Sequence, residues 1–285
     1  MAQFDYVRAQ SIAEATRLLS EAGHASRALA GGTDLMVFVR HEKPPFDRLV
    51  DITRIPELRI IKRDGEQILI GAAVTFSEAA ESLLLQEEAA CLVEACRSVG
   101  GPAIRNSGTL GGNVVNAAAC ADSLPPLACM EAAAHISGPD GTRNLPIAGL
   151  VQGANRSALQ VGELLTHFSL PVLPLYARSG FIKLGRRNAQ AISRLSMAAA
   201  ARLDEQGRID FVRIASGAAT PVVQRYTEAE TFLLGQKPEP EALREAAHLC
   251  AAAMIAITGR RWSSEYKESA IQGLAEQTLR RVLSA

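Results

Sequence analysis

Near the N-terminus, apolar positions recur at the spacing of an amphipathic helix. Ser11 and Glu14 form a capping box in front of this helix, which is expected to stop at Gly23. Residues 27–30 then predict a short strand, and residues 35–40 predict the start of a second helix. The segment between them is therefore expected at a helix N-terminus, where free N–H groups and the helix dipole favour an anion.

From residue 49 onward, short strand patterns alternate with turn signals and brief helical patterns. Asp64 and Gly65 form a turn signal of hairpin type, and residues 139–141 form another. The pattern predicts strands over residues 49–52, 58–62, 67–71, 132–137 and 142–147, and helices over residues 77–85 and 88–99. This part of the chain is typical of a mixed α+β arrangement.

Pro171 and Pro174 interrupt the pattern and mark the best candidate for a linker, because proline breaks both helices and strand ladders. Beyond them, residues 196–203 and 209–216 predict a hairpin. Two helical stripes follow, one through Leu243, Ala247, Cys250, Met254 and Ile257, the other through Tyr266, Ala270, Leu274 and Val282. We expect an α+β fold of three units, residues 1–55, 56–174 and 175–285, the last a small antiparallel sheet with packed helices.

Charge and composition narrow the classes of function. The 285 residues carry 30 basic and 30 acidic side chains, with no basic tract and few aromatic residues, which argues against nucleic acid as a partner. The sequence has no apolar run of membrane-spanning length, and its N-terminus lacks the features of a signal peptide. We therefore expect a cytoplasmic protein.

The cysteines and histidines do not form a recognisable reactive site. None of Cys91, Cys96, Cys120, Cys129 and Cys250 falls in a CxxC pair, and we expect them to be reduced and mostly buried. The five histidines are scattered without ligand spacing, so we assign no metal ligand and no catalytic residue. The chemistry is then expected to belong to a cofactor.

Two glycine pairs stand beside polar side chains, Gly31 and Gly32 before Thr33, and Gly111 and Gly112 before Asn113. Neither lies in a GxGxxG or GxxxxGK[ST] motif, which excludes the familiar Rossmann and P-loop interpretations. Successive N–H groups can form an anion nest beside hydroxyl and amide groups, which suits a dinucleotide. The alternative is that both pairs are tight turns at sheet corners, with Asp34 only capping the following helix.

Residues 29–35 and residues 104–113, the latter continued to Asp122, resemble the two FAD-contacting segments of the molybdenum hydroxylase flavoproteins. Residues 181–187 and 264–267 resemble the opening of that family's C-terminal domain and its closing helix. This family includes the medium subunits of bacterial xanthine, nicotinate and carbon monoxide dehydrogenases. The resemblance covers nearly the whole chain. It implies a fold shared with vanillyl-alcohol oxidase and p-cresol methylhydroxylase, with two FAD-binding subdomains, residues 1–55 and 56–174, before the C-terminal domain.

The resemblance also implies which residues contact the cofactor. Val99 stands where the family often has a larger apolar or aromatic residue, and Lys183 matches a basic residue near the flavin, where a cation favours the reduced ring. From the residues alone, Asp122 could equally cap a helix beginning at Ser123, and Lys183 could be solvated. The implied contacts are Leu29, Ala30, Gly31, Gly32, Thr33, Asp34, Leu35, Met36, Val99, Thr109, Gly111, Gly112, Asn113, Asp122, Leu165 and Lys183.

The function implied by the resemblance is electron transfer. FAD in this chain would take electrons from the clusters of a small [2Fe–2S] subunit and pass them to NAD or another acceptor, while a large molybdopterin subunit hydroxylates the substrate. Purines or nicotinate are the favoured substrates. Two alternatives remain: a stand-alone flavin oxidase of the vanillyl-alcohol oxidase type, and an interaction module with a vestigial nucleotide site.

Overall fold

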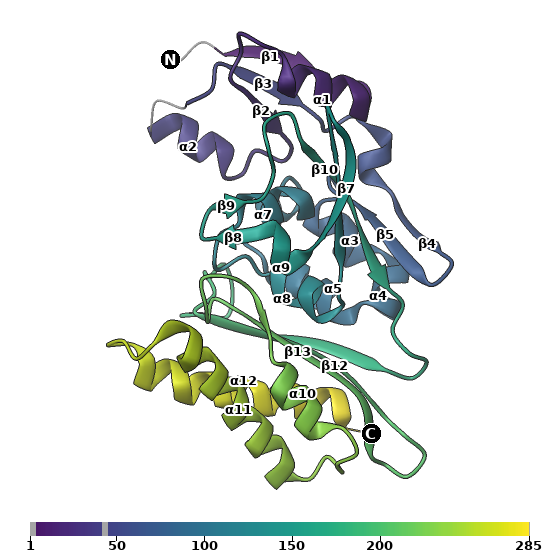
Figure 1. Cartoon of the computed structure of the whole chain (residues 1–285), viewed down its shortest axis with the longest axis vertical. Coiled ribbons are helices and arrows are strands. Elements are labelled where there is room, and N and C mark those ends of the chain that lie inside the picture. The colour runs from purple at the N-terminus through teal and green to yellow at the C-terminus, as the bar shows by residue number, and fades with distance from the viewer. Residues whose placement is uncertain (1–3, 42–44, 285) are drawn as a thin grey trace.

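The computed structural model describes residues 4–41 and 45–284, and its three main sheets follow one another along the long axis of the molecule (Figure 1). The N-terminal sheet lies at one end, and the C-terminal helices lie at the other. The first three residues, part of the segment that lacks signal-peptide features, fall outside the described residues. No helix among the residues placed by the structure is both long enough and apolar enough to cross a membrane.

The first sheet is parallel, with the order β1-β3-β2. Its elements are β1 (Asp5–Arg8), α1 (Ile12–Ser20), β2 (Ser26–Leu29), α2 (Leu35–His41) and β3 (Arg48–Asp51). The central strand β3 is buried along its whole length. The core beneath this sheet also includes Leu58, Ala73 and Leu164, so the first unit shares its core with the second.

Helix α1 has the expected N-cap, with one change of partner. The Ser11 side chain accepts the Glu14 N–H at 3.2 Å, while the Glu14 carboxylate accepts the N–H of Gln10 at 2.7 Å rather than that of Ser11. Two donors at the helix start are satisfied either way.

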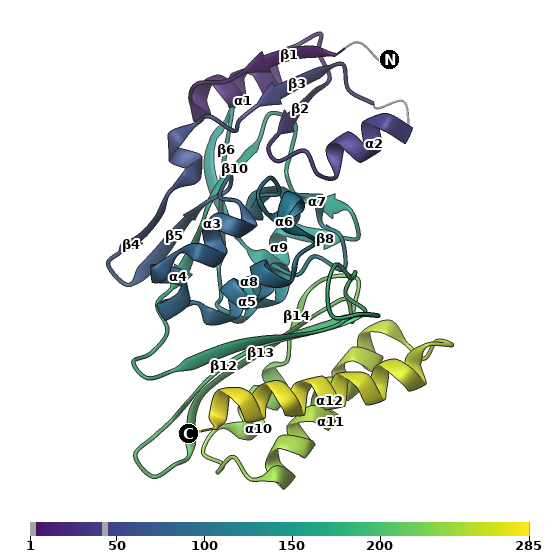
Figure 2. The same cartoon turned by 180° about the vertical axis from the view of Figure 1, so that it is seen from behind.

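The second sheet has the order β4-β5-β10-β6-β7 and is antiparallel throughout. Helices cover one face, where residues such as Ile70, Phe168 and Ile136 join the largest core (Figure 2). The strands are β4 (Ile61–Asp64), β5 (Gln67–Gly71), β6 (Ala133–Gly138), β7 (Gly141–Pro146) and β10 (Leu164–Pro171), with a small pair β8 (Val151–Gly153) and β9 (Arg156–Ser157). The helices are α3 (Phe76–Glu81), α4 (Leu83–Glu88), α5 (Ala90–Ser98), α6 (Pro102–Arg105), α7 (Leu110–Asn116), α8 (Leu124–Cys129) and α9 (Ile147–Leu150).

Two expected elements in this unit are wrong. The strand expected over residues 58–62 is instead a 3₁₀ helix (Pro56–Arg59) followed by β4, because Pro56 starts a helical turn that buries Leu58. The single helix expected over residues 77–85 is two helices. Thr75 caps α3 in a complete capping box with Glu78, and Ser82 ends α3 and caps α4.

The third sheet is antiparallel with the order β11-β12-β13-β14, and three helices pack on one face. Its elements are β11 (Arg178–Leu184), β12 (Leu195–Leu203), β13 (Ile209–Gly217), β14 (Gln224–Arg225), α10 (Thr227–Leu233), α11 (Pro240–Thr258) and α12 (Ser264–Leu283). The predicted hairpin is confirmed as β12 and β13. Ile257 and Tyr266, expected in the apolar stripes, are each 49% exposed because they lie next to the α11–α12 turn, beyond the packed length of the helices.

Helix α5 joins the second and third sheets. The Glu94 carboxylate accepts the N–H of Phe181 in β11 at 2.8 Å and forms an ion pair with Arg281 of α12. The Cys91 N–H donates to Ser179 Oγ at 3.1 Å. A helix therefore covers the edge strand of the C-terminal sheet, which protects that edge from pairing with another chain. The domain limits at residues 55 and 174 stay a prediction.

Four of the five cysteines are buried, and Cys120 is half-buried. Burial raises the pKa of the Cys91 thiol to about 12, and it raises the pKa values of Cys96, Cys129 and Cys250 as well. In the described parts of the chain, no three metal-ligating side chains come together.

Asp51 at the end of β3 generates a prediction about acid stability. Burial raises its pKa, but hydrogen bonds from Thr53, Tyr6 and Arg8 outweigh burial and lower the pKa to about 2. The ionised carboxylate therefore stabilises the fold above about pH 4, and this contribution disappears as the pH falls toward 2. Asp51→Asn should lower the free energy of unfolding at pH 7 by about 2 kcal/mol.

Urea unfolding of the wild type and Asp51→Asn at pH 7 and at pH 3 measures this contribution. The difference between the two proteins should shrink at pH 3. A difference of equal size at both pH values would show that lost packing, not the ionised carboxylate, accounts for the effect.

Candidate functional site

The two glycine segments, far apart in sequence, lie directly against each other. A Cβ atom on Gly31 would lie 1.9 Å from the carbonyl oxygen of Ser107 and 2.9 Å from the Cα of Gly108. No side chain fits at Gly31, so the absence of one is what lets the first segment touch the second. This contact joins the parallel sheet to the helical layer of the second unit.

The first segment leaves β2 and enters α2 through backbone hydrogen bonds. The Gly32 carbonyl accepts the Met36 N–H at 2.9 Å, and the Asp34 carbonyl accepts the Phe38 N–H at 3.0 Å. Gly32 has φ +69°, a conformation that favours glycine. The Asp34 side chain is exposed, and within the described chain neither it nor the Thr33 hydroxyl has a hydrogen-bond partner. The alternative in which the Asp34 carboxylate caps α2 therefore has no support.

The second segment is not the loop that the sequence predicts. Helix α6 separates it from α5, and Gly111 and Gly112 lie in the first turn of α7. Thr109 is the N-cap of α7, and its hydroxyl accepts the Gly112 N–H at 3.0 Å. The hydroxyl and the first turn thus form a compact start to the helix.

Gly111 and Gly112 differ in their surroundings. A Cβ on Gly111 would lie 2.6 Å from the backbone oxygen of Ala72, so packing against Ala72, the residue after β5, requires glycine there. Gly112 is exposed, and a Cβ on it would meet only Thr109 Oγ1, at 2.8 Å. The fold accounts for Gly111, whereas Gly112 leaves the helix start bare on its outer side.

Asp122 and Lys183 form a buried ion pair. Lys183 Nζ lies 2.6 Å from Asp122 Oδ2, and the two side chains are 12% and 7% exposed. Lys183 also donates to the Ser98 carbonyl at 3.2 Å, and the Ser193 hydroxyl donates to Asp122 Oδ1 at 2.5 Å. Burial raises the pKa of Asp122, and the Lys183 charge opposes that shift.

These contacts exclude two alternatives that the sequence left open, a solvated Lys183 and an Asp122 that caps α8. Lys183 is not solvated. Asp122 does not cap α8, whose N-cap is Ser123 and which receives no side-chain hydrogen bond at that end. The pair instead ties the second unit to β11 of the third.

Leu165 and Val99 are placed differently from the other predicted residues. Leu165 lies in β10 within the main core and is 2% exposed. Val99 ends α5, packs partly buried against the same core, and accepts a hydrogen bond from Arg105 through its carbonyl. Their implied contact with a cofactor stays a prediction.

The remaining predicted residues form a continuous strip. Gly31 contacts Ser107, the Ser123 hydroxyl donates to Asn113 Oδ1 at 2.7 Å, and the residue before Ser123, Asp122, pairs with Lys183. Ser107, Ser123 and Ser193 were not predicted as participants. Ser107 lies within the second segment, residues 104–113, and Ser123 follows Asp122, so both could have been found from the motifs, but nothing in the sequence links Ser193 to Asp122.

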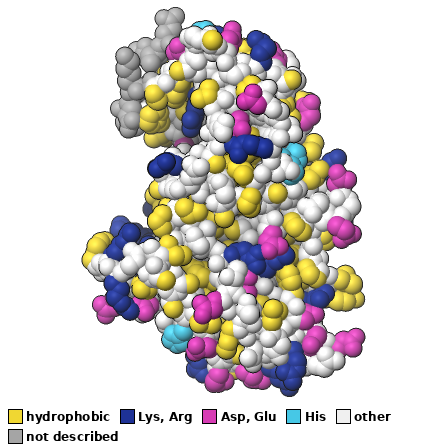
Figure 3. All heavy atoms as spheres, in the orientation of Figure 1, with side chains coloured by type: hydrophobic (Ala, Val, Ile, Leu, Met, Phe, Trp, Pro, Cys, Tyr) yellow, Lys and Arg dark blue, Asp and Glu magenta, His cyan; other side chains and the backbone are white. Residues whose placement is uncertain are grey.

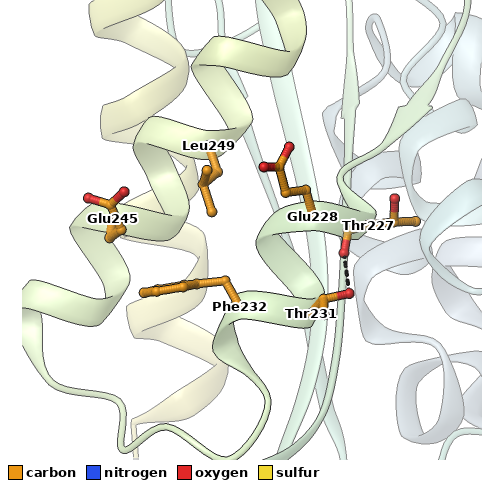
Figure 4. A pocket seen from close by; sticks show the side chains of 6 residues that line it. All are labelled: Thr227, Glu228, Thr231, Phe232, Glu245 and Leu249. Carbon is orange, nitrogen blue, oxygen red and sulfur yellow. Dashed lines mark hydrogen bonds between the residues drawn. The ribbon is translucent and has the colours of Figure 1, made fainter.

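Two surface hollows lie elsewhere. One, of about 580 Å³, lies between α10 and α11, where Phe232 and Leu249 face each other with Glu228 and Glu245 at the rim (Figure 4). The other, of about 430 Å³, lies beside α3 and α6 and includes Arg97 and Arg105. Neither is lined by a predicted site residue.

Gly31→Ala should destabilise the protein severely. The added methyl group would overlap the Ser107 carbonyl, which is backbone and cannot move aside, so we expect a loss of about 3 kcal/mol or more. Thermal unfolding and soluble yield measure the loss. Gly273→Ala is the matched control because a Cβ there meets nothing within 4 Å and a helix favours alanine. Equal stability of Gly31→Ala and wild type would contradict the contact.

Removing one partner of the buried pair should cost more than removing both. Lys183→Met leaves Asp122 charged and unpaired, and we expect a loss of about 3 kcal/mol. The double variant Asp122→Asn, Lys183→Met leaves no buried charge and should recover part of that loss. Urea unfolding of the two single variants and the double variant gives the coupling energy, and strictly additive effects would show that the pair does not stabilise the domain junction.

Comparisons with known proteins agree with this architecture. Residues 2–173 match the family model described as the FAD binding domain in molybdopterin dehydrogenase, and residues 180–282 match the CO dehydrogenase flavoprotein C-terminal domain. The chain is 32% identical over 283 residues to the xanthine dehydrogenase FAD-binding subunit of Escherichia coli O157:H7, covering 98% of this chain and 96% of that one. It is 32% identical over 268 residues to the carbon monoxide dehydrogenase medium chain of Afipia carboxidovorans, covering 93% and 91%.

A solved structure gives the same result in three dimensions. The reconstituted CO dehydrogenase from Oligotropha carboxidovorans superposes with a TM-score of 0.92 at 28% identity, covering 99% of this chain and 98% of that one. The expected mixed helix-and-sheet fold, with an FAD-binding domain before a C-terminal domain, is confirmed. The chain belongs to the family of FAD-binding medium subunits of the molybdenum hydroxylases.

Proposed function

We propose that this chain is the FAD-carrying electron-transfer subunit of a heterotrimeric molybdenum hydroxylase. The observation that carries the proposal is the contact of Gly31 with the Ser107 carbonyl. It brings two glycine-bearing backbone segments side by side and leaves Thr33 and Asp34 exposed or half-buried beside them. An extended dinucleotide can then be held from both segments along one strip.

The residues of the strip fit FAD. The bare first turn of α7 at Gly112 lets a ligand approach the backbone closely, and nearby Thr33 and Asp34 have no partner within the described chain. Hydroxyl and carboxylate groups suit the ribityl and ribose hydroxyls of FAD. Bound there, FAD accepts electrons and passes them on.

The Asp122–Lys183 pair has a positioning role in this proposal. The carboxylate neutralises Lys183, so the pair does not present a free cation to the flavin. It holds β11 and the loop after it against the strip, with Ser193 as the second anchor of that loop. The predicted contacts from Leu29 to Lys183 are proposed on this basis.

The partners and the route of the electrons follow from the relatives. Related proteins include subunits of a xanthine dehydrogenase and of the 6-hydroxypseudooxynicotine dehydrogenase complex of Paenarthrobacter nicotinovorans, the latter 30% identical over 283 residues. We propose a molybdopterin large subunit, a [2Fe–2S] small subunit, a nitrogen-heteroaromatic substrate such as a purine or nicotinate, and NAD or another acceptor, all in the cytoplasm.

Gly112→Val should remove FAD while leaving the fold intact. The branched side chain would project from the bare start of α7, with only a modest cost to the Thr109 cap of about 1 kcal/mol. The measurement is the visible flavin spectrum of the purified chain, together with its far-ultraviolet circular dichroism. Gly273→Val, in the open surface of α12, is the control and should keep the flavin.

A colourless wild-type protein that takes up no FAD would overturn the proposal. Retained flavin in a folded Gly112→Val variant would show that the cofactor lies elsewhere. Oxidation of small phenols by the yellow chain alone would favour a stand-alone flavin oxidase.

A further inference from the structure

Trp262 is the single tryptophan of the chain, and it is 98% exposed at the turn between α11 and α12. Tryptophan has a large apolar surface and is highly buried in most folded proteins. Nothing in this fold uses that surface. Its exposure indicates a surface that another molecule covers.

The side chains around Trp262 are of types that are enriched in protein–protein interfaces. Arg260 and Arg261 precede it, and the Arg194 guanidinium lies 5.8 Å from the centre of the Tyr266 ring. Ile192, in the loop between β11 and β12, is 77% exposed. We call Ile192, Arg194, Arg260, Arg261, Trp262 and Tyr266 the Arg–Trp surface. Tryptophan, tyrosine and arginine are the residues that most often dominate the binding energy of protein interfaces.

The six residues of this surface include three arginines and no acidic residue, although Glu265 and Glu268 follow closely in α12 and the chain as a whole is neutral. Arg186 and Arg187 are exposed in the same β11–β12 loop as Arg194. Arg260 forms an ion pair with Glu268 at 3.1 Å, whereas Arg261 donates to the Thr258 carbonyl. The α11–α12 turn projects from one side of the molecule, and basic, acidic and hydrophobic side chains lie there together (Figure 3).

The Arg–Trp surface is continuous with the candidate site. Arg194 follows Ser193, whose hydroxyl donates to Asp122, the partner of Lys183. On α12, Lys267 donates to the Ala218 carbonyl at 3.0 Å, and the Ala218 N–H donates to the carbonyl of Ala119, just after α7. A protein bound to this surface would therefore stand at the border of the strip.

We infer that the Arg–Trp surface is the docking site of the [2Fe–2S] subunit, whose complementary face presents carboxylates around an apolar recess for Trp262. This inference rests on the proposed function, because a partner that exchanges electrons with the flavin must approach the flavin strip. Arginine pairs with carboxylates through two parallel hydrogen bonds, which gives the contact both direction and specificity. A second copy of this chain is disfavoured, since its own arginines would face these arginines.

The test measures binding of the purified FAD-loaded chain to the [2Fe–2S] subunit of its own complex. Trp262→Ala should raise the dissociation constant about 30-fold, the usual effect of truncating an interface hot spot. The double variant Arg260→Glu, Arg261→Glu should raise the dissociation constant at least as much. Added salt should also weaken binding of the wild-type chain. Trp262→Phe should retain most of the affinity.

Two controls separate this effect from general surface changes. Tyr176→Ala removes another aromatic residue that is 83% exposed, outside the Arg–Trp surface. Arg244→Glu reverses a charge at the opposite end of α11, where Arg244 pairs with Glu241. Both controls should bind the [2Fe–2S] subunit with wild-type affinity.

The flavin spectrum distinguishes failure of this inference from failure of the proposed function. Wild-type affinity of the Trp262 and arginine variants, with FAD fully retained, would overturn the docking site alone. Weakened binding of the molybdopterin subunit with unchanged binding of the [2Fe–2S] subunit would also overturn it, as would a loss of self-association alone. Absence of FAD from the wild-type chain would instead count against the proposed function.

In the assembled complex, Trp262 also provides a direct readout. 5-Fluorotryptophan incorporated into this chain alone gives one fluorine resonance. Addition of the [2Fe–2S] subunit should shift that resonance, because Trp262 would pass from water into an apolar recess. An unchanged resonance on binding would overturn the inference.

Discussion

The contact between Gly31 and the backbone of Ser107 and Gly108 is the constraint on which the rest of this structure depends. The parallel sheet of the first unit and the antiparallel sheet of the second have separate ladders and meet through a shared core. The glycine contact brings the connection after β2 onto the segment before α7. Without it, the connection after β2 and the start of α7 would not meet.

The buried Asp122–Lys183 pair does for the third unit what the glycine contact does for the first two. It lies beside the α5–β11 junction, where Glu94 binds the β11 backbone and Arg281. Buried ion pairs contribute little net stability compared with apolar packing, but an unpaired partner is costly. The pair therefore ties β11 to α5 and to the segment before α8.

Local features of the sequence were sufficient to predict many helices and strands, but not which of these elements contact one another in the fold. The cap at Ser11 and the hairpin around residues 204–207 follow from neighbouring residues, and the structure confirms both. The strand predicted over residues 58–62 was wrong at its start, because Pro56 begins a 3₁₀ turn that runs to Arg59. Gly111 and Gly112 looked like loop residues, yet a buried N-cap at Thr109 and packing on Ala72 make them the start of a helix.

The same limit applies to the candidate site. Motif resemblance identified both glycine segments, Asp122 and Lys183, but their mutual contacts depend on residues distant in sequence. Lysine side chains are usually exposed to solvent, and only the placement of β11 beneath α5 buries Lys183 against Asp122. Ser193 lies in no recognisable sequence motif. Its role depends on the path of the β11–β12 loop, which no local pattern specifies.

The four glycines of the candidate site differ in the structural reason for each glycine. Gly31 and Gly111 are required by close backbone contacts, and Gly32 by its positive φ. Gly112 has an ordinary helical position, an exposed surface and no contact that forbids a side chain except the neighbouring Thr109 hydroxyl. Glycine in a helix costs about 1 kcal/mol relative to alanine, and a Cβ on Gly112 would lie 2.8 Å from the Thr109 Oγ1 that caps α7, so the cap accounts for part of the preference for glycine there. FAD placed against the first turn of α7, as we propose, would account for the rest.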